Sequence, residues 1–400
     1  AMGLLCQPDI LIADEPTTAL DVTVQSQIIR LLDELAEQSS TAILLITHDL
    51  GIIAGLSDHV LVMRHGEIVE RADVDPLFES PAHPYTELLL KSVPRLDQPL
   101  AGTEPSKPDS TPRQARAPVL TIEQLSVQYQ VSTGNGWLKP HFDTIRAVDD
   151  ISFELQPAET LGIVGESGCG KSTLARAILG LVRPASGQIV WMGKNLVELD
   201  EDSMRRQRRD IQMVFQDPLG SLDPRMTVGQ IIGEPLRNFF PSMSRLQVRE
   251  RALGMLQMVG LRPEHINRYP HEFSGGQCQR IGIARALVAN PRLVVCDEPV
   301  SALDVSIQAQ IIKLLQDLQQ KLRLSLIFIA HDLSVVRHMS DRVLVMHEGK
   351  IVELADSDRI YTDPQHPYTQ QLIESVPIPD PAAERERSRR LAERLDQVVE

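Results

Sequence analysis

Three things are scarce in this 400-residue sequence: cysteine, long apolar runs and positive charge. The four cysteines are Cys6, Cys169, Cys278 and Cys296. Their spacing fits neither a metal site nor a disulfide framework, which favours a reducing cytoplasm. No apolar run approaches the ~20 residues that a membrane-spanning helix needs, and we find no secretion-signal pattern, so we expect membrane association only through partners. The net charge of −14 argues against a nucleic-acid partner held by bulk electrostatics.

The sequence does contain enough apolar material, 42%, for the cores of two or three domains. Its most specific motif is a phosphate loop, G-x-x-x-x-G-K-[ST], between an apolar run at 161–164 and a helix-like stretch at 173–179. There the backbone N–H groups can curl around phosphates, and the helix N-terminus adds positive potential. A glycine-rich turn without a ligand is the alternative. The motif predicts nucleoside triphosphate binding by Gly165, Glu166, Ser167, Gly168, Cys169, Gly170, Lys171, Ser172 and Thr173.

Two carboxylates end an apolar run at 293–296, which has no polar alternation and therefore predicts a strand buried on both faces of a parallel sheet. Asp297 would hold Mg²⁺ together with the hydroxyl of Ser172. Glu298 is then free to polarise the attacking water, a role worth roughly 10²–10⁴ in rate. Taken alone the pair would be a solvated strand end, but its position downstream of a phosphate loop favours the catalytic interpretation.

Two further motifs supply polar groups. A four-residue signature opens a helical stretch: Ser274, Gly275, Gly276 and Gln277. Its serine can cap the helix, and its glycines let a phosphate approach the N-terminus, although a simple capped helix start is the alternative. His331 follows an apolar run at 326–330 and could hydrogen-bond the γ-phosphate from a strand of the same sheet, with a structural histidine as the alternative.

In this order, the motifs resemble those of an ABC-type ATPase, over nearly the whole chain. The resemblance implies an α/β fold of the P-loop NTPase class, with a parallel-sheet core, an antiparallel β subdomain and a helical signature subdomain. It also implies ATP and Mg²⁺ as cofactors. Gln216 matches the glutamine loop that senses Mg²⁺ and touches the membrane subunit, Tyr129 the aromatic that stacks on adenine, and 301–304 the dimer-contact loop. The implied catalytic residues are Glu298, His331 and Gln216. The implied metal ligands are Ser172, Gln216 and Asp297.

Residues 8–94 align without a gap onto residues 291–377, and about half of the aligned positions are identical. A match of this length indicates duplication of a whole unit, because a solenoid would repeat at a far shorter period. The first copy has Asp14, Glu15 and His48 as its counterparts of the strand-end carboxylates and histidine, but no phosphate loop, glutamine loop or signature. We therefore interpret the chain as one N-terminally truncated copy followed by one complete copy.

The missing part of the first copy has a physical consequence. Residues 10–13 and 43–46 are central-type strands, and their neighbours in the second copy come from the region that the first copy lacks. We expect apolar surface and strand edges to be uncovered there, and residues 1–94 alone to be poorly stable or prone to aggregation.

Six segments follow from these motifs and from composition. They are the C-terminal part of a first ATPase domain, 1–97; a Pro-rich linker, 98–118; a complete second domain, 119–380; within it a helical subdomain at about 218–285 and a C-terminal element at about 356–380; and a charged tail, 381–400, expected to be a solvated helix.

Two elements narrow the resemblance to peptide and nickel importer ATPases, and within these to fused two-copy members of the glutathione and dipeptide import type. Residues 215–225 resemble their extended glutamine loop, and the His-Pro-Tyr-Thr runs at 83–86 and 366–369 resemble their C-terminal element. We expect no metal at these histidines, because no other ligands cluster nearby. The resemblance implies two membrane-spanning permease subunits, a substrate-binding protein, and a second ABC ATPase domain from a missing N-terminal module or a homodimer. It places the chain on the cytoplasmic face of the bacterial inner membrane.

Other functions stay open. Lys171 has no first-copy signature to face, so the chain could be a fragment that binds ATP without turnover, or one whose weak hydrolysis depends on concentration. A tandem ABC protein acting on ribosomes would need a long charged helical linker, and a DNA-repair ATPase would need zinc cysteines or coiled-coil heptads. Cys278 stands where relatives commonly have Arg, and we expect only modest weakening of helix-surface contacts. We expect Cys169 to be an exposed, alkylation-sensitive thiol.

Overall fold

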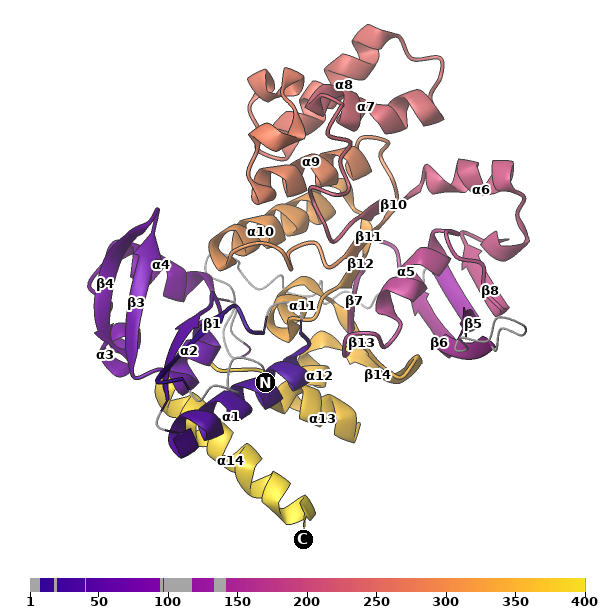
Figure 1. Cartoon of the computed structure of the whole chain (residues 1–400). Coiled ribbons are helices and arrows are strands. Elements are labelled where there is room, and N and C mark those ends of the chain that lie inside the picture. The colour runs from indigo at the N-terminus through magenta and orange to yellow at the C-terminus, as the bar shows by residue number, and fades with distance from the viewer. Residues whose placement is uncertain are drawn as a thin grey trace. The chain divides into compact units, whose positions relative to one another are not determined.

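The computed structural model describes residues 8–17, 20–39, 41–93, 96, 117–132 and 142–399. These residues form two compact units (Figure 1). Unit 1 comprises residues 1–105, 304–309 and 370–400, and unit 2 comprises residues 106–303 and 310–369. Cys6, Thr18, Ala19 and most of the predicted linker lie outside the described residues.

Unit 2 is built on a six-stranded sheet in the order β10-β11-β12-β7-β13-β14. The strands are β7 (Thr160–Val164), β10 (Ile211–Val214), β11 (Leu293–Asp297), β12 (Ser325–Ile329), β13 (Arg342–His347) and β14 (Lys350–Asp356). All neighbours are parallel except β13 and β14. Every residue of β7, β11 and β12 is buried, which confirms the prediction of a doubly covered strand before Glu298. The carboxyl ends of parallel strands meet at one edge, where such sheets bind ligands.

A second, antiparallel sheet of unit 2 has the order β6-β5-β8-β9. Its strands are β5 (Leu120–Ser132), β6 (Phe142–Leu155), β8 (Ser186–Trp191) and β9 (Lys194–Asn195). Leu120 and Trp191 from this sheet share one core with Ile163 of β7 and with Leu174 of α5 (Lys171–Ile178). The helix that follows the phosphate loop is therefore fixed between the two sheets. Helix α6 (Glu201–Arg208) leads from this sheet to β10.

The segment between β10 and β11 is mainly helical, with α7 (Val228–Phe239), α8 (Arg245–Met258) and α9 (Gly275–Leu287). Each begins with a capping box, in which a serine or threonine hydroxyl and a glutamine three residues later satisfy each other's backbone N–H. Helices α10 (Val305–Leu322), α11 (Leu333–Met339), α12 (Ser357–Thr362) and α13 (Pro367–Glu374) follow.

Unit 1 repeats part of this plan. Its strands are β1 (Ile10–Asp14), β2 (Ala42–Ile46), β3 (His59–Arg64) and β4 (Glu67–Asp73), and its first helices are α1 (Val22–Ser39), α2 (Leu50–Leu56), α3 (Val74–Glu79) and α4 (Pro84–Ser92). In unit 2, β7 lies between β12 and β13, but no described strand of unit 1 takes that place. Unit 1 therefore has two separate two-stranded sheets, β1-β2 and β3-β4.

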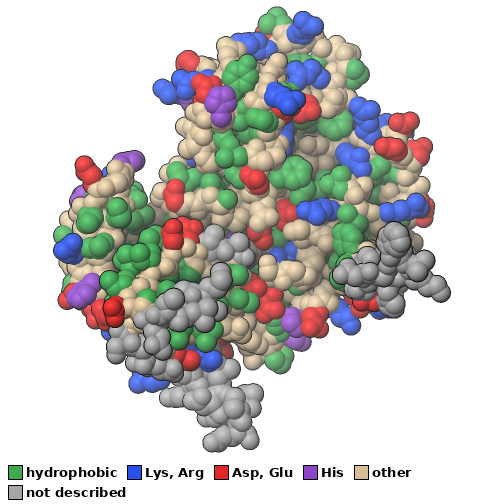
Figure 2. All heavy atoms as spheres, viewed as in Figure 1, with side chains coloured by type: hydrophobic (Ala, Val, Ile, Leu, Met, Phe, Trp, Pro, Cys, Tyr) green, Lys and Arg blue, Asp and Glu red, His purple; other side chains and the backbone are tan. Residues whose placement is uncertain are grey.

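Large apolar side chains are exposed on both sheets of unit 1. Ile10 and Ile12 of β1 are 63% and 64% exposed, and Leu44 of β2 is 48% exposed. Met63 and Ile68 are exposed on the hairpin of β3 and β4, where Figure 2 shows hydrophobic side chains at the surface. The expectation of uncovered apolar surface in this part of the chain is confirmed, whereas its poor stability in isolation stays a prediction.

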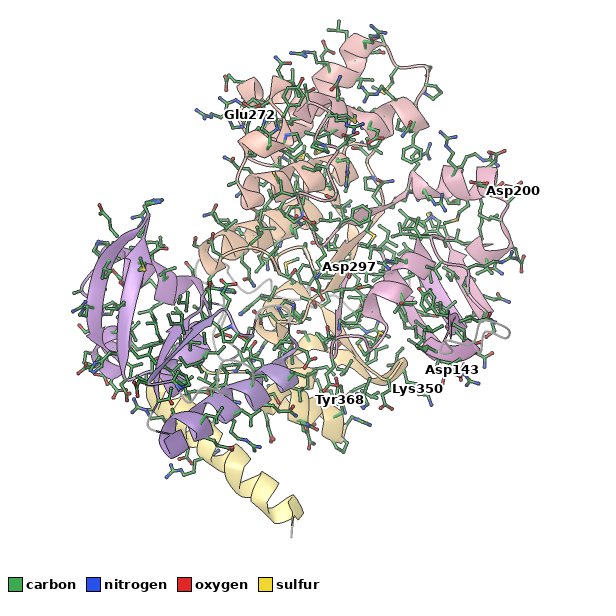
Figure 3. The ribbon with its side chains drawn as sticks, in the orientation of Figure 1. Asp143, Asp200, Glu272, Asp297, Lys350 and Tyr368 are labelled. Atoms are coloured by element: carbon green, nitrogen blue, oxygen red, sulfur yellow. The ribbon has the colours of Figure 1, made fainter. Side chains whose placement is uncertain are left out.

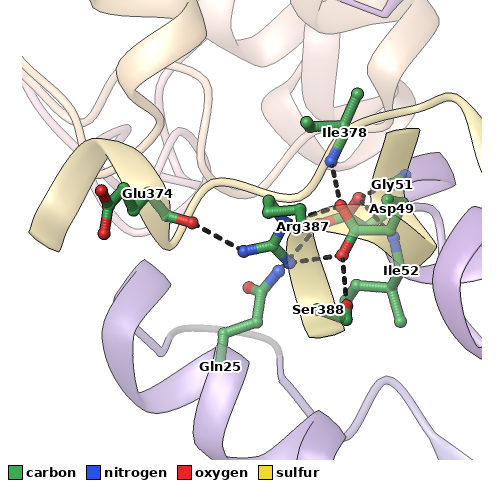
Figure 4. A network of polar contacts seen from close by, with 9 residues as sticks. Gln25, Asp49, Gly51, Ile52, Glu374, Ile378, Arg387 and Ser388 are labelled. Atoms are coloured by element: carbon green, nitrogen blue, oxygen red, sulfur yellow. Dashed lines mark hydrogen bonds and ion pairs between the residues drawn. The ribbon is translucent and has the colours of Figure 1, made fainter. Parts of the chain in front are cut away.

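The C-terminal segment packs within unit 1. Helix α14 (Pro381–Val399) contacts α2 and α3, and Arg385 pairs with Asp75 at 2.7 Å. Glu384 is 4% exposed, and its carboxylate accepts hydrogen bonds from the Ile378 N–H and from Arg387 (Figure 4). The predicted helix is confirmed, but the expectation of a wholly solvated tail is wrong for its first turns, because these side chains are ordered against the end of α13 and against α2.

Candidate active site

The phosphate loop needs glycine for two reasons, conformation and space. Gly165 and Gly170 have φ of 148° and 107°, in the region that side chains rarely adopt. A Cβ on Gly165 would lie 2.2 Å from the Met346 carbonyl oxygen, and one on Gly170 would lie 2.0 Å from the Ala147 carbonyl oxygen. The loop is thus pressed against β13 and β6, and only a bare backbone fits.

Lys171 is the buried cation of this loop, with 6% of its surface exposed. Its Nζ donates to the carbonyl oxygens of Gly165, at 2.7 Å, and Glu166, at 2.8 Å. Ser167 and Gly168 are exposed, and Thr173 is half-buried in the first turn of α5. An ammonium beside a loop of turned backbone amides forms a site for phosphate oxygens.

Two of the three predicted metal ligands, Ser172 on α5 and Asp297 on β11, lie together, whereas the side chain of the third, Gln216, bonds to Glu298. The Ser172 hydroxyl donates to the Asp297 carboxylate at 3.0 Å. Burial raises the pKa of Asp297, which is 4% exposed, although the bond from Ser172 opposes this rise. A buried carboxylate beside a hydroxyl is the kind of oxygen pair that Mg²⁺ takes alongside nucleotide phosphates and water. No described cluster of three or more His, Cys, Asp or Glu residues could hold a metal.

The three predicted catalytic residues also lie together, around Glu298. Gln216 Nε2 donates to Glu298 Oε2 at 2.8 Å, and His331 Nδ1 lies 3.7 Å from the same oxygen. Glu298 has a φ of 47°, a strained conformation of the sort that collects at functional sites.

The electrostatics of this cluster favour an ion pair. The close approach of His331, at 3.7 Å, outweighs burial and lowers the pKa of Glu298. Burial alone would lower the pKa of His331, but the polar contact with Glu298 and the negative charges of Glu298 and Asp332 outweigh it, so that pKa is raised. Glu298 is therefore ionised at neutral pH and available to polarise water.

Unit 1 contains a matching pair. His48 Nδ1 lies 3.2 Å from Glu15 Oε1, and the φ of Glu15 is 44°, close to the value of Glu298. Asp14 ends β1 as Asp297 ends β11, but it is exposed. The duplicated strand ends thus keep the same local conformation, although no described residues of unit 1 form a phosphate loop beside them.

The signature is not brought to the phosphate loop of the same chain. Ser274 caps α9 as predicted, and its hydroxyl and Gln277 bond to each other's backbone N–H. Figure 1 shows α9 beside α7 and α8, away from α5. A Cβ on Gly275 would lie 3.5 Å from Leu303, while Gly276 is buried. Tyr129 is 36% exposed on β5 and pairs with Ile145 of β6, the strand whose Ala147 carbonyl lies against Gly170 of the phosphate loop.

The expected exposure of Cys169 and the expected surface position of Cys278 are wrong, whereas the modest effect expected of Cys278 stays a prediction. Cys169 is 7% exposed, and burial raises the pKa of its thiol, so it is not the exposed, reactive group expected from a variable loop position. Cys278 is fully buried, and its Sγ lies 3.5 Å from the Pro270 carbonyl oxygen, so it belongs to the core of the helical segment and not to a helix surface. Both side chains turn inward because of tertiary packing.

Two residues near the site were missed by the sequence reasoning. Arg285 of α9 donates to the Ser221 carbonyl and lies over the Phe215 ring at 5.7 Å, so it joins the signature helix to the glutamine loop. Nothing in its local sequence distinguishes it from other arginines. The hydroxyl of Tyr368, which Figure 3 labels on α13, accepts a hydrogen bond from the Glu166 N–H of the phosphate loop at 3.1 Å. The duplicated His-Pro-Tyr-Thr run was the signal that could have found it.

Comparisons with known proteins agree with this geometry. The ABC transporter family model matches residues 148–301, and the model of the oligopeptide/dipeptide transporter C-terminal region matches residues 69–119 and 352–398. The chain is 58% identical over 280 residues to the oligopeptide transport ATP-binding protein OppF of Escherichia coli, covering 70% of this chain and 84% of that protein. It is 46% identical over 397 residues to the glutathione import ATP-binding protein GsiA of Pectobacterium atrosepticum, covering 96% of this chain. The chain spans 63% of the length of that relative.

A solved structure shows the same likeness. The dimeric structure of MJ0796, a bacterial ABC transporter cassette, matches with a TM-score of 0.54 and 29% identity, over 60% of this chain and 98% of that one. The fold and site therefore define an ABC-type ATPase cassette. The chain belongs to the ABC transporter ATP-binding proteins, and among these it is similar to those of oligopeptide and glutathione importers. None of the described helices is both long and apolar enough to span a membrane.

Proposed function

We propose that the chain is the ATP-hydrolysing subunit of an ABC importer for peptides, whether dipeptides, oligopeptides or glutathione. One observation carries the proposal: the Glu298 carboxylate, held by Gln216 and His331, lies at the same sheet edge as the bonded pair Ser172 and Asp297. The phosphate loop begins directly after β7, at Gly165. Since β7 lies in the same sheet as β11, parallel to its neighbours β12 and β13, its carboxyl end and the loop lie at that edge too. The names of the relatives support the substrate class.

In this proposal each described group has a role. Lys171 exchanges its carbonyl partners for phosphate oxygens, and Ser172 and Asp297 would hold Mg²⁺, which neutralises charge on the phosphates when bound. Glu298 polarises the attacking water, which Gln216 helps to orient. His331 keeps Glu298 in place and donates toward the γ-phosphate. Tyr129 would stack on adenine.

The site would be completed by a second ATPase domain. The signature, Ser274 to Gln277, bonds within its own helix and not to the phosphate loop of the same chain. We propose that it faces the phosphate loop of a partner domain, either a further N-terminal module or a second copy of this chain. Residues 119–380 would act as one complete domain in that pairing.

The remaining partners follow from the importer class. Two membrane-spanning permease subunits would contact the region around Gln216, and a substrate-binding protein would deliver the peptide. The chain would then lie at the cytoplasmic face of a bacterial inner membrane. The contacts of Arg285 with Ser221 and Phe215 support the proposed role of the glutamine loop, since they would carry motion of the signature helix α9 to the part of the chain that contacts the permease subunits.

A second candidate is a partner-dependent subunit that binds ATP without turnover. It is favoured by unit 1, where the pair of Glu15 and His48 stands without a described phosphate loop. ATPase rate and sedimentation, measured together over a hundredfold range of protein concentration, separate the two candidates. A rate per mole that rises with the dimer fraction supports the homodimer, and a rate that stays flat on dilution contradicts it. ATP binding without turnover at any concentration favours the second candidate.

A further inference from the structure

We propose that Tyr368 is a positioning residue of the phosphate loop, through which the C-terminal element of the importer type sets the affinity for ATP. The proposal rests on the proposed function, since it assigns a residue to the same ATP site. Its observation is the bond between the Tyr368 hydroxyl and the Glu166 N–H, 3.1 Å long, across about two hundred residues of sequence. Tyr368 is 8% exposed, so water competes little for this bond.

Tyr368 is itself held in place from several sides. The Glu353 carboxylate of β14 accepts from the His366 N–H at 3.0 Å, and it also accepts from Gln365. The His366 imidazole in turn accepts from the Tyr368 N–H at 3.2 Å. The tyrosine ring packs on His347 at the end of β13, with ring centroids 4.0 Å apart. The hydroxyl is therefore presented to the loop by the edge of the central sheet.

The bond acts on one particular peptide. The Gly165 carbonyl and the Glu166 N–H belong to the same peptide group, and Lys171 donates to that carbonyl at 2.7 Å. Tyr368 thus holds the peptide on one side and Lys171 holds it on the other. ATP binding requires Lys171 to leave this carbonyl for a phosphate while the loop keeps its shape. A fixed Glu166 N–H lets the lysine move without carrying the loop with it.

The first copy contains the same anchor without the loop. Glu70 accepts from the His83 N–H at 3.1 Å, and the His83 imidazole accepts from the Tyr85 N–H at 3.1 Å. Arg64 occupies the position in the first copy that His347 has in the second, and its guanidinium lies 4.7 Å from the centre of the Tyr85 ring. Tyr85 is therefore a matched control, since it has the same local structure and no described phosphate loop to position. The histidines of both elements accept backbone N–H groups at the starts of α4 and α13.

The test compares Tyr368→Phe with Tyr85→Phe, both of which keep the ring and remove the hydroxyl. Loss of one hydrogen bond predicts an ATP dissociation constant raised about fivefold in Tyr368→Phe. The rate at saturating ATP should stay within about twofold, because Glu298 and its partners are untouched. Tyr85→Phe should match the wild type in both quantities. If Tyr368 served stability alone, Tyr368→Phe would lower the melting temperature but would not raise the ATP dissociation constant while leaving the rate at saturating ATP unchanged.

Hydrogen exchange gives a readout that does not depend on ATP binding. In Tyr368→Phe the amide of Glu166 loses its acceptor, so peptides covering 165–168 should exchange faster while those of α9 are unchanged. Equal exchange in wild type and Tyr368→Phe overturns the proposal, whatever the ATP affinity. Faster exchange with unaltered ATP affinity also overturns it, because the bond would then not serve nucleotide binding. If Tyr368→Phe exchanges faster than the wild type but the wild type itself binds no ATP, the proposed function is contradicted.

Discussion

The Gln216 side-chain amide donates to the Glu298 carboxylate at 2.8 Å, although 82 residues separate the two in sequence. The strand ends of β10 and β11 bring them together, because these strands are parallel neighbours. The proposed base is therefore bonded to the glutamine loop that would contact the membrane subunits. Motion of that loop would change the position and basicity of Glu298, so in the proposed function this one hydrogen bond would link transport to hydrolysis.

Glu298→Gln should retain ATP binding and lose hydrolysis. The amide keeps the shape of the side chain, and the phosphate loop is untouched, but a neutral amide cannot polarise water. We expect a loss of about 10²–10⁴ in rate, with an ATP dissociation constant close to that of the wild type. Steady-state ATPase assays and nucleotide titration measure the two quantities.

The first copy supplies the control for this change. Glu15→Gln makes the same change at the corresponding strand end of the first copy, where Glu15 has nearly the same φ as Glu298 and pairs with His48. No described phosphate loop lies beside it. Its ATPase rate should stay within about twofold of the wild type. Undiminished turnover in Glu298→Gln would remove Glu298 from the role of base.

The ion pair of Glu298 and His331 should make stability depend on pH at both ends of a window. The pKa of His331 is raised above 6.5, so its contribution to the free energy of unfolding is complete below that pH and is lost as pH rises through the raised value. The pKa of Glu298 is lowered below 4.5, so its contribution to the free energy of unfolding is complete above that pH and is lost as pH falls through the lowered value. The pair is intact between these limits. The effect should be small, because 36% of the His331 side chain is exposed and solvent screens the charges.

Thermal unfolding of the wild type and of His331→Gln across pH measures this contribution. The difference in melting temperature between them should be largest from pH 4.5 to 6.5 and should shrink on either side. A difference that grows steadily toward alkaline pH would show that His331 acts as a neutral group and not as the partner of Glu298.

Gly170→Ala should abolish the phosphate loop, whereas Gly168→Ala should only strain it. Both glycines have positive φ, which costs a side chain about 1–2 kcal/mol. At Gly170 the new Cβ would also lie 2.0 Å from the Ala147 carbonyl oxygen, while at Gly168 nothing lies within 4 Å. Overpacking adds about 1–3 kcal/mol, so Gly170→Ala should be clearly less stable and should lose ATP affinity by more than about tenfold. Equal behaviour of the two variants would mean that the contact with β6 does not shape the loop.

The sequence was sufficient where local chemistry decides the structure. The uninterrupted apolar residues of β11, the serine that caps α9 and the glycines of the phosphate loop each act through their own backbone, and all were predicted. It was insufficient where distant segments decide. The burial of Cys169 and Cys278, the packing of Glu384 and the bond from Tyr368 to the loop depend on which element lies opposite, and no local pattern encodes that.

Gly51 of α2 should be the residue that allows the C-terminal segment to pack within unit 1. A Cβ there would lie 2.6 Å from the Pro377 side chain and 3.0 Å from its carbonyl carbon. Gly51→Ala should therefore push residues 376–380 away and expose Glu384, with a cost of about 1–3 kcal/mol that exceeds the gain in helix propensity. Gly254→Ala in α8 is the control, since nothing lies within 4 Å of its Cβ and the change should be neutral or stabilising by up to about 1 kcal/mol. Chemical denaturation measures the stability, and limited proteolysis should cut Gly51→Ala faster near α14. If the two variants are equally stable and equally resistant, the C-terminal helix is not held at α2.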